Sequence, residues 1–524
     1  MSHYKPDPNK SVNLSIDGFP VTVPEGTRIL EAARKANIKI PTLCDCPGMG
    51  KRSVCRLCVV KCDGRDKPVA ACAYDVWEGA SIVTNSADLA AIRKMIVELL
   101  LANHPQECLT CIRNKKCELQ SLAADFGIRK PPFSREAADR RPSETEGETL
   151  VRDMAKCIKC GRCVEVCQEV QTVKAINSSY RSVNYEICTP YRQALIDGPC
   201  VFCGRCAAAC PVGAIYEYDQ SAEVWAALND SERHVTVQIS AAMGTALESE
   251  LGLPPGTVTG GRMVTALKSI GFDTVFDSDY SVDTAVAEDG GELLYRINNS
   301  KKLPMITGCT PGLSRFIERF YPGLLEHLAV IRSPQRIFGS LVKTRYPKQL
   351  GLDPSRITTV SVMPCISFKF EARKQSTGGL RDVDIVLSTR ELARMILQTG
   401  IDFNGLPESP FDCIKSFCFG DISPPGPGAG ALGGMEAVLR RRHEVYTGKR
   451  PGPVIFKEPG AGIAEAEAEL QGNKVKVLIA NGLANARTVM ESILMGKCDA
   501  VLVEIKNCSS CDASAGSIKE AGRS

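Results

Sequence analysis

Two cysteine-rich runs decide the fold of this chain: CIKCGRCVEVC at residues 157–167 and CVFCGRCAAACP at residues 200–211. Each follows the spacing C-x2-C-x2-C-x3-C, in which three thiolates bind one [4Fe-4S] cluster and the fourth binds the cluster of the other run. The predicted ligand sets are Cys157, Cys160, Cys163 and Cys210 for one cluster, and Cys200, Cys203, Cys206 and Cys167 for the other. Zinc also binds C-x2-C pairs but stops at four ligands. Eight cysteines in two matching sets therefore favour clusters, and with them electron transfer.

The composition indicates a large multidomain protein in a reducing compartment. The chain has 524 residues, and its 64 lysines and arginines against 60 aspartates and glutamates give a net charge of +4, too balanced for a nucleic-acid or membrane-surface partner. Most of the 25 cysteines fall in short C-x2-C spacings, which favours metal ligands over disulfides. The first residues lack an apolar signal segment, and the apolar stretch 95–102 is too short to span a membrane. We expect a cytoplasmic protein without a membrane span.

Residues 1–88 have the pattern of a small β-rich module. Residues 11–23 alternate apolar and polar side chains around an Asp17-Gly18 turn, and residues 26–38 have the apolar period of a short helix. A loop with three cysteines, followed by a fourth after a later strand, is typical of a [2Fe-2S] site in a ferredoxin domain of the β-grasp type. The predicted ligands are Cys44, Cys55, Cys58 and Cys72. We take Cys46 and Cys62 as spare, Cys62 because it alternates with core-facing residues of its strand.

Residues 89–129 combine a helix with a cluster site of a different kind. The apolar stretch 89–103 is helical in pattern and precedes an H-x3-C-x2-C-x5-C motif, which supplies one imidazole and three thiolates to a [4Fe-4S] cluster. The ligands of this set are His104, Cys108, Cys111 and Cys117. A neutral imidazole leaves the cluster less negative than a thiolate does, so we expect this cluster to be reduced more easily.

The rest of the chain is predicted to contain a linker and two further domains. Residues 130–150 are charged, carry prolines and lack an apolar period, as in a linker, and residues 151–220 hold the two cysteine runs in a ferredoxin-like domain. Residues 221–524 alternate apolar strands with helices, which predicts parallel sheets covered on both faces. The fold class is therefore multidomain, α+β and α/β. Four cysteines follow the carboxyl ends of predicted strands, where such sheets bind ligands: Cys309, Cys365, Cys508 and Cys511. Four more receive no role: Cys188, Cys413, Cys418 and Cys498.

The order of these modules resembles the catalytic subunit of modular [FeFe]-hydrogenases over nearly the whole chain. The N-terminal half also resembles the large peripheral iron-sulfur subunit of respiratory complex I. Four segments of the C-terminal domain follow the order of the hydrogenase signatures: TGCTPG at 307–312, MPCISFKFE at 363–371, GALGGMEAVLR at 430–440 and VEIKNCSSC at 503–511. The resemblance implies an α/β domain built around the H-cluster site of that family.

The signatures depart from the family pattern around this cofactor. The resemblance places the proton-relay cysteine at Cys309, but Thr310 stands where active members have a cluster ligand, and a hydroxyl is a poor ligand for iron that prefers thiolates. Phe368 stands at a lysine position and Lys506 at a methionine position. The last signature has Cys508-x2-Cys511 followed by DASAG in place of C-x3-C followed by glycines.

These departures predict that the H-cluster is absent and that the chain has no hydrogenase activity of its own. Glu292 and Glu371, at positions that resemble the proton path of the family, are retained, and buried carboxylates can also be structural. Two interpretations of the C-terminal pocket stay open. Its four cysteines, Cys309, Cys365, Cys508 and Cys511, hold an ordinary [4Fe-4S] cluster, or the pocket holds no cluster.

The resemblance implies an iron-sulfur electron-transfer subunit of an NAD(P)-linked, electron-bifurcating hydrogenase-type complex. The glycine-rich segment GAGALGG at 428–434 is not a G-x-G-x-x-G fingerprint that opens a helix directly after a predicted strand, so nicotinamide chemistry is expected in another subunit. The partners implied are a flavoprotein that oxidises NAD(P)H, a small [2Fe-2S] subunit, ferredoxin, and a separate [NiFe]-hydrogenase or formate dehydrogenase subunit. Two alternatives remain: an active [FeFe]-hydrogenase with variant ligation, and a module that senses redox state or hydrogen.

Overall fold

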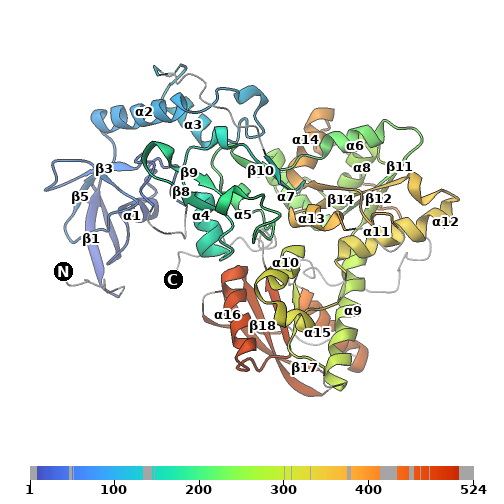
Figure 1. Ribbon diagram of the computed structural model, residues 1–524. Helices are drawn as coiled ribbons and strands as arrows, with labels where there is room; N and C mark the ends of the chain where they lie inside the picture. Colours follow the sequence, from blue (N-terminus) through green and yellow to red (C-terminus); the bar gives the residue numbers. More distant parts are fainter. Residues whose placement is uncertain are drawn as a thin grey trace.

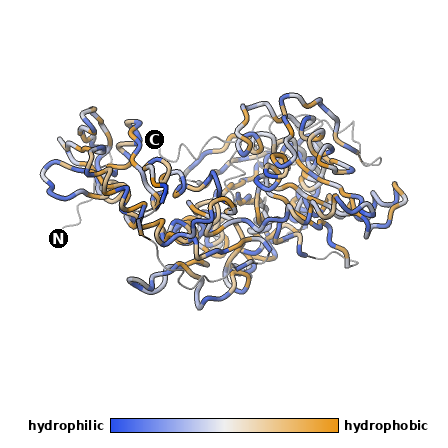
Figure 2. Tube along the Cα trace, turned by 90° about the horizontal axis from the view of Figure 1, so that it is seen from above, coloured by the Kyte–Doolittle hydropathy of each residue, from blue (hydrophilic) through white to orange (hydrophobic). Residues whose placement is uncertain are grey.

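The computed structural model shows the N-terminal modules in the order of the chain, followed by two α/β lobes whose segments alternate along the sequence (Figure 1). The residues that it describes are 7, 9–46, 50, 52–130, 132–133, 144–146, 148–299, 301–308, 310–330, 332–374, 379–413, 434–447, 454–460, 462–470 and 472–506. The N-terminal module lies at one end of an elongated molecule, and the segment with the two cysteine runs lies between it and two α/β lobes (Figures 1 and 2). Among the described residues, no helix is long and apolar enough to cross a membrane.

The N-terminal module is a five-stranded sheet in the order β2-β1-β5-β3-β4. The strands are β1 (Ser11–Ile16), β2 (Phe19–Pro24), β3 (Val59–Cys62), β4 (Val69–Ala70) and β5 (Ser81–Val83). Asp17 and Gly18 both have positive φ, as the tight turn of a two-residue hairpin requires, and Ile16 pairs with Phe19 across it. Helix α1 (Ile29–Lys35) buries its apolar face against the sheet.

Two helices follow this module. They are α2 (Ala87–Ala102) and α3 (Glu118–Asp125), with a short 3-10 turn at Cys108–Thr110 between them. Arg93 of α2 is buried and donates hydrogen bonds to the carbonyl oxygens of Val59 (2.7 Å) and Thr84 (2.9 Å). These bonds fix α2 to the strands that follow the loop of the first cysteine set.

The segment with the two cysteine runs contains short elements around a three-stranded sheet, β10-β7-β6. Its elements are β6 (Glu144–Glu146), β7 (Leu150–Arg152), α4 (Arg162–Glu165), the π-helix Val166–Val170, β8 (Asn177–Ser179), β9 (Glu186–Cys188), α5 (Arg205–Ala209) and β10 (Ile215–Glu217). Gly161 and Gly204 precede α4 and α5 with φ of 77° and 74°, a conformation that glycine adopts at low cost and that explains the repeated CGRC of the two runs.

Strand β6 corrects one sequence prediction, because it lies inside the predicted linker 130–150. It pairs antiparallel with β7, with Glu144 opposite Arg152. An edge strand of this kind is held through its backbone, so its ETE sequence carries no apolar pattern that could reveal it.

The first α/β lobe has a parallel four-stranded sheet in the order β12-β11-β14-β15, as predicted. The strands are β11 (His234–Ile239), β12 (Thr274–Asp277), β14 (Ile357–Met363) and β15 (Ile385–Ser388). The helices are α6 (Ser221–Leu228), α7 (Gly244–Leu251), α8 (Gly260–Ile270), α11 (Pro334–Thr344), α12 (Tyr346–Leu350), α13 (Ser367–Ala372) and α14 (Thr389–Thr399).

The second lobe has a mixed sheet, β13-β19-β18-β17-β16, where the sequence predicted a parallel one. The strands are β13 (Met305–Gly308), β16 (Lys457–Gly460), β17 (Ile463–Leu470), β18 (Asn473–Asn481) and β19 (Leu502–Lys506), with helices α9 (Asp279–Asn298), α10 (Pro311–Phe320), α15 (Gly434–Thr447) and α16 (Gly482–Leu494). Strand β17 is antiparallel to β18 and buries its alanines while its glutamates face outward. This alternation is the pattern of an antiparallel strand with one face near water.

One apolar core joins the second lobe to the segment with the cysteine runs. It includes Val201 and Phe202 of the second run together with Phe316 of α10 and Met490 of α16. Arg487 of α16 also donates a 3.0 Å hydrogen bond to the carbonyl oxygen of Thr172. The two regions therefore fold as one packed unit.

Candidate iron-sulfur centres and the C-terminal pocket

The first cysteine set is brought together at one edge of the N-terminal module. The thiol of Cys44 is in hydrogen-bonding contact with those of Cys55 and Cys72, and the thiol of Cys58 is in contact with that of Cys72. The pKa of Cys72 is raised to about 11, because the bond with Cys44, which lowers it, is outweighed by the bond with Cys58 and by burial. Cys62 lies in the core beneath the sheet and faces Ile82 across the β3–β5 pair.

The set with one histidine lies at the surface. Burial raises the pKa of Cys117, and the charges of Cys111 and Cys108 add to the effect, so the three thiols are neighbours. The Nδ1 atom of His104 is buried and has no hydrogen-bond partner among the described residues. Burial, with the nearby Lys156 ammonium, lowers the pKa of His104 and favours the neutral imidazole that a metal ligand requires. Cys108 is exposed and Leu109 beside it is 91 % exposed, so this centre is open to a partner.

The third set is buried where the two cysteine runs meet. The pKa of Cys157 is raised to about 11 and that of Cys160 to about 12. In both cases burial is the main cause, and the charge of Cys210 contributes in the same direction. Burial raises the pKa of Cys163 far above its usual range, and the charges of the three other thiols contribute. Four neighbouring thiols with so little exposure to solvent are suited to a cationic centre that binds them as thiolates.

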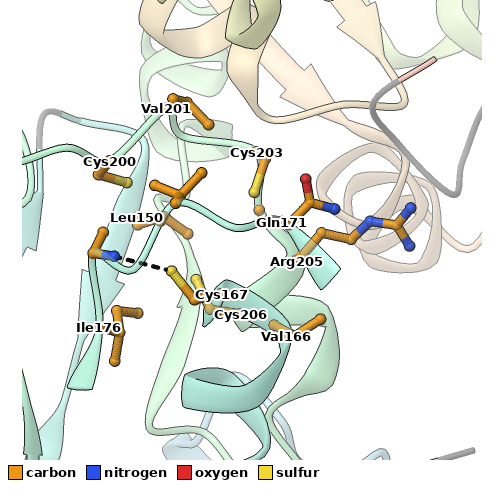
Figure 3. A pocket seen from close by; sticks show the side chains of 13 residues that line it. Leu150, Val166, Cys167, Gln171, Ile176, Cys200, Val201, Cys203, Arg205 and Cys206 are labelled. Carbon is orange, nitrogen blue, oxygen red and sulfur yellow. Dashed lines mark hydrogen bonds between the residues drawn. The ribbon is translucent and has the colours of Figure 1, made fainter. Parts of the chain in front are cut away.

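The fourth set lines a cavity within the segment with the two cysteine runs (Figure 3). Its thiols belong to Cys167, Cys200, Cys203 and Cys206. Burial raises the pKa of Cys203 to about 11, while the backbone N–H of Ala175 donates a 3.3 Å hydrogen bond to Cys167 Sγ. The charge of Cys163 also raises the pKa of Cys206, so the third and fourth sets are adjacent. The sulfur-lined, apolar cavity has the chemistry of an iron-sulfur site.

Of the four cysteines predicted for the C-terminal pocket, only Cys365 belongs to the described residues. It follows β14 of the first lobe, is buried, and its Sγ lies 3.1 Å from Ser367 Oγ. Cys309, Cys508 and Cys511 lie outside the described residues. Gly308 and Lys506 end adjacent parallel strands of the second lobe, whereas Cys365 follows a strand of the first lobe.

Thr310 and Phe368, which depart from the family pattern, both lie in buried positions. Thr310 precedes α10, and its buried hydroxyl has no hydrogen-bond partner among the described residues. Phe368 is 7 % exposed and packs in an apolar cluster with Cys365, Ala372 and Val383. Neither side chain, in this arrangement, offers charge to the pocket.

The two retained carboxylates are held by neighbouring groups. Glu292 pairs with the Arg296 guanidinium and accepts a 3.0 Å hydrogen bond from the backbone N–H of Val330. Glu371 accepts a hydrogen bond from Ser333 Oγ, and burial raises its pKa. These contacts are sufficient to keep both carboxylates in place.

Comparison with known proteins decides the family. The model described as "Iron only hydrogenase large subunit, C-terminal domain" matches residues 233–511. The chain belongs to the iron-only hydrogenase large-subunit family. Models of a 2Fe-2S iron-sulfur cluster binding domain, an NADH-ubiquinone oxidoreductase-G iron-sulfur binding region and a 4Fe-4S dicluster domain match residues 9–87, 93–132 and 156–214. The resemblance predicted from the motifs is thus confirmed, and the hydrogenase-like domain is preceded by 2Fe-2S and 4Fe-4S binding domains.

Individual relatives in the iron-only hydrogenase family cover most of the chain. The NADP-reducing hydrogenase subunit HndD of Solidesulfovibrio fructosivorans is 37 % identical, over 92 % of this chain and 84 % of the relative. Iron hydrogenase 1 of Clostridium pasteurianum is 34 % identical, over 94 % of this chain and 86 % of the relative. A solved structure of the [FeFe]-hydrogenase HydA1 from Chlamydomonas reinhardtii is 29 % identical, over 56 % of this chain and 83 % of that chain, with a TM-score of 0.49.

The sequence did not single out the residues that join the fourth cysteine set to this iron-only hydrogenase domain. Arg315 of α10 donates 2.6 Å hydrogen bonds to the carbonyl oxygens of Cys200 and Ile196. Its guanidinium also lies over the rings of Phe202 and Phe370. An arginine on an amphipathic helix gives no signal of such a role, because these contacts exist only after distant segments have packed.

Proposed function

We propose that the chain is an electron-transfer subunit of an NAD(P)-linked, electron-bifurcating hydrogenase-type complex, and that its C-terminal pocket does not hold an H-cluster. The coarse part of this statement rests on the family: the chain is an iron-sulfur oxidoreductase subunit, similar to a protein named as an NADP-reducing hydrogenase subunit. The proposed cofactors are one [2Fe-2S] and three [4Fe-4S] clusters, held by the four sets described above. A cluster in each set would supply one-electron storage.

The observation that carries the loss of the H-cluster is the orientation of α13. Phe368 occupies the apolar cluster beside Cys365, and the lysine next to it is committed elsewhere. Lys369 forms a fully buried ion pair with Glu391 (3.0 Å) and donates hydrogen bonds to Val386 and Gln220. Breaking a buried pair of this kind costs about 3 to 5 kcal/mol, so Lys369 is not available to the pocket.

The proposed path of electrons follows the arrangement of the sets. The His104 set is exposed and suits contact with a partner, and the third and fourth sets are adjacent in the middle of the molecule. The proposed partners are a flavoprotein that oxidises NAD(P)H, a small [2Fe-2S] subunit and ferredoxin, with a separate [NiFe]-hydrogenase or formate dehydrogenase as the catalytic subunit.

Anaerobic isolation of the tagged chain from its native host tests the proposal. We expect a flavoprotein to co-elute, and NADH or NADPH to reduce the clusters of the chain, as followed by EPR, only while that flavoprotein is present. In a complex with Cys206→Ser, the fourth cluster should be lost or altered while the [2Fe-2S] signal still forms. A chain that isolates alone and that neither ferredoxin nor a nicotinamide-linked partner reduces would contradict the proposal.

A further inference from the structure

The side chain of Gln171 is buried at the fourth cysteine set without a protein partner. Gln171 is 0 % exposed and follows the π-helix Val166–Val170, to which its backbone N–H is bonded at Val166 O (2.9 Å). Neither its Nε2 nor its Oε1 has a hydrogen-bond partner among the described residues. Burying an amide donor without a partner is unfavourable, so its burial here indicates a partner that the described residues do not supply.

This amide belongs to the lining of the sulfur cavity, as does the side chain of Arg205 (Figure 3). Arg205 Nε is likewise buried without a partner among the described residues, but so is Arg162 Nε at the same position of the other run, so the arginines do not distinguish the two sets. Apart from the cysteines, the rest of the described lining is apolar or glycine: Leu150, Val166, Val173, Ala175, Ile176, Val201 and Gly204. The cysteine sulfurs are therefore the side-chain acceptors that this cavity offers to the Gln171 amide.

The two cysteine runs differ at this position. Gln171 lies four residues after Cys167, the last cysteine of its run, whereas Ala214 lies four residues after Cys210. Ala214 is buried, and its methyl side chain has no hydrogen-bond donor. The repeated motif therefore gives the two central clusters the same thiolate ligands but not the same surrounding hydrogen bonds.

We propose that Gln171 donates an N–H···S hydrogen bond to the cluster of the fourth set and holds the reduction potential of this cluster above that of the third set. This inference rests on the proposed cluster assignment. Such bonds stabilise the additional negative charge of the reduced cluster and so raise its potential. Electrons that enter through the N-terminal centres would then be drawn toward the set that contacts the C-terminal domain. Gln171 is a positioning residue in this scheme, since the cysteines alone bind iron.

Gln171→Leu in the full chain tests the proposal, with Gln168→Leu as the matched control. Gln168 lies in the π-helix that precedes Gln171. Its side chain forms hydrogen bonds with Ile176 O and Asn177 and does not line the cavity. In EPR-monitored redox titrations, Gln171→Leu should lower the midpoint potential of one [4Fe-4S] cluster by about 59 mV. This shift corresponds to about a tenfold change in the equilibrium constant of a one-electron reduction. The other midpoints, and every midpoint of Gln168→Leu, should not change. An unchanged midpoint in Gln171→Leu with full cluster content would overturn the inference.

A second measurement on the unmodified protein covers the case in which Gln171→Leu loses the cluster. Protein labelled with 15N at the glutamine side-chain amides should show a 15N coupling to a reduced [4Fe-4S] cluster in pulsed EPR. Gln171 is the only glutamine in the described lining of the cavity. No such coupling would overturn the inference. Unmodified protein without signals from two central cubanes would instead contradict the proposed cluster assignment, so the two failures are distinguishable.

Discussion

The rings of Phe202 and Phe370 stack with their centroids 4.9 Å apart and 16° between their planes. Phe202 lies between Cys200 and Cys203 of the fourth set, and Phe370 lies on α13, five residues after Cys365. The stack therefore joins the last proposed cluster of the path to the segment that carries the C-terminal pocket. Arg315 covers both rings, at 5.3 Å and 4.8 Å from their centroids.

Arg315→Met should loosen this junction. The methionine keeps much of the packing but leaves the carbonyl oxygens of Cys200 and Ile196 without their charged donor. The loss is about 3 kcal/mol of local stability, or roughly a hundredfold faster hydrogen exchange in segment 196–203. Arg319→Met is the control, because Arg319 is exposed and makes only one long contact of 3.4 Å with Ile196. Equal exchange rates in the two variants would contradict the role given to Arg315.

Iron analysis after anaerobic reconstitution should give about 14 to 18 iron atoms per chain. One [2Fe-2S] and three [4Fe-4S] clusters need about 14, a fifth cluster at Cys365 raises the content to about 18, and a complete H-cluster would raise it to about 20. Saturation at about 8 iron atoms per chain, with all modules folded, would mean that at least one N-terminal set has been assigned wrongly.

His104→Cys should keep a [4Fe-4S] cluster and lower its potential, because a thiolate adds negative charge at the iron. His104→Ala should lose or destabilise that cluster and leave the two central cubanes intact. His327→Ala is a suitable control, since the ring of His327 bonds the carbonyl oxygen of Pro304 and lies in the second lobe. If EPR of His104→Ala shows every cluster signal unchanged, His104 is not a ligand.

The isolated chain should neither evolve nor take up hydrogen, even when it is produced with the maturation proteins of active relatives. Thr310 and Phe368 give the pocket no thiolate or cation at their positions, so retention of a diiron unit as well as turnover should be lost. Infrared bands of iron-bound carbon monoxide and cyanide, together with hydrogen turnover, would restore the alternative of an active hydrogenase. Cys365→Ser then shows, by its iron content, whether the pocket holds an ordinary cubane.

Asp289→Asn should stabilise the protein near neutral pH. Burial raises the pKa of Asp289 to about 6; the hydrogen bond from Thr307 opposes this shift, and the charges of Glu292, Glu288 and Glu504 add to it. The folded state thus binds this proton more tightly than the unfolded state, whose aspartate has a pKa of about 3.9, and stability falls as pH rises through this window. The advantage of Asp289→Asn over the unmodified protein should grow by about 1 kcal/mol from pH 5 to pH 7 and then level off.

Thermal unfolding of the anaerobic protein at several pH values measures this difference. Glu288→Gln is the control, because it replaces an exposed carboxylate on the same helix by an uncharged amide. An advantage of Asp289→Asn that is constant from pH 5 to pH 8 would show that Asp289 is not protonated in the folded state.

Much of the module order and most of the strands and helices followed from the sequence. Candidate cluster ligands are recognisable from short spacings such as C-x2-C, because three ligands of a cluster come from one tight loop and the fourth follows at a typical spacing. The first lobe was also predictable, since its strands are apolar throughout and are separated by helices. Strand β17 carried a period-two signal, IAEAEAEL, which indicates an antiparallel strand, but the expectation of parallel sheets did not use it.

The sequence by itself determined which cysteines belong to which run, and the structure places the thiols of each N-terminal set as neighbours. Only the tertiary structure decided what surrounds them: the cover of Arg315 over Phe202, the buried amide of Gln171, and the ion pair that removes Lys369 from the pocket. Local spacing reveals the candidate ligands because most thiols of a set lie within one short loop. Burial and hydrogen bonding depend instead on contacts between segments far apart in the chain, such as Lys369 with Glu391 or Arg315 with Cys200, and no local pattern records them.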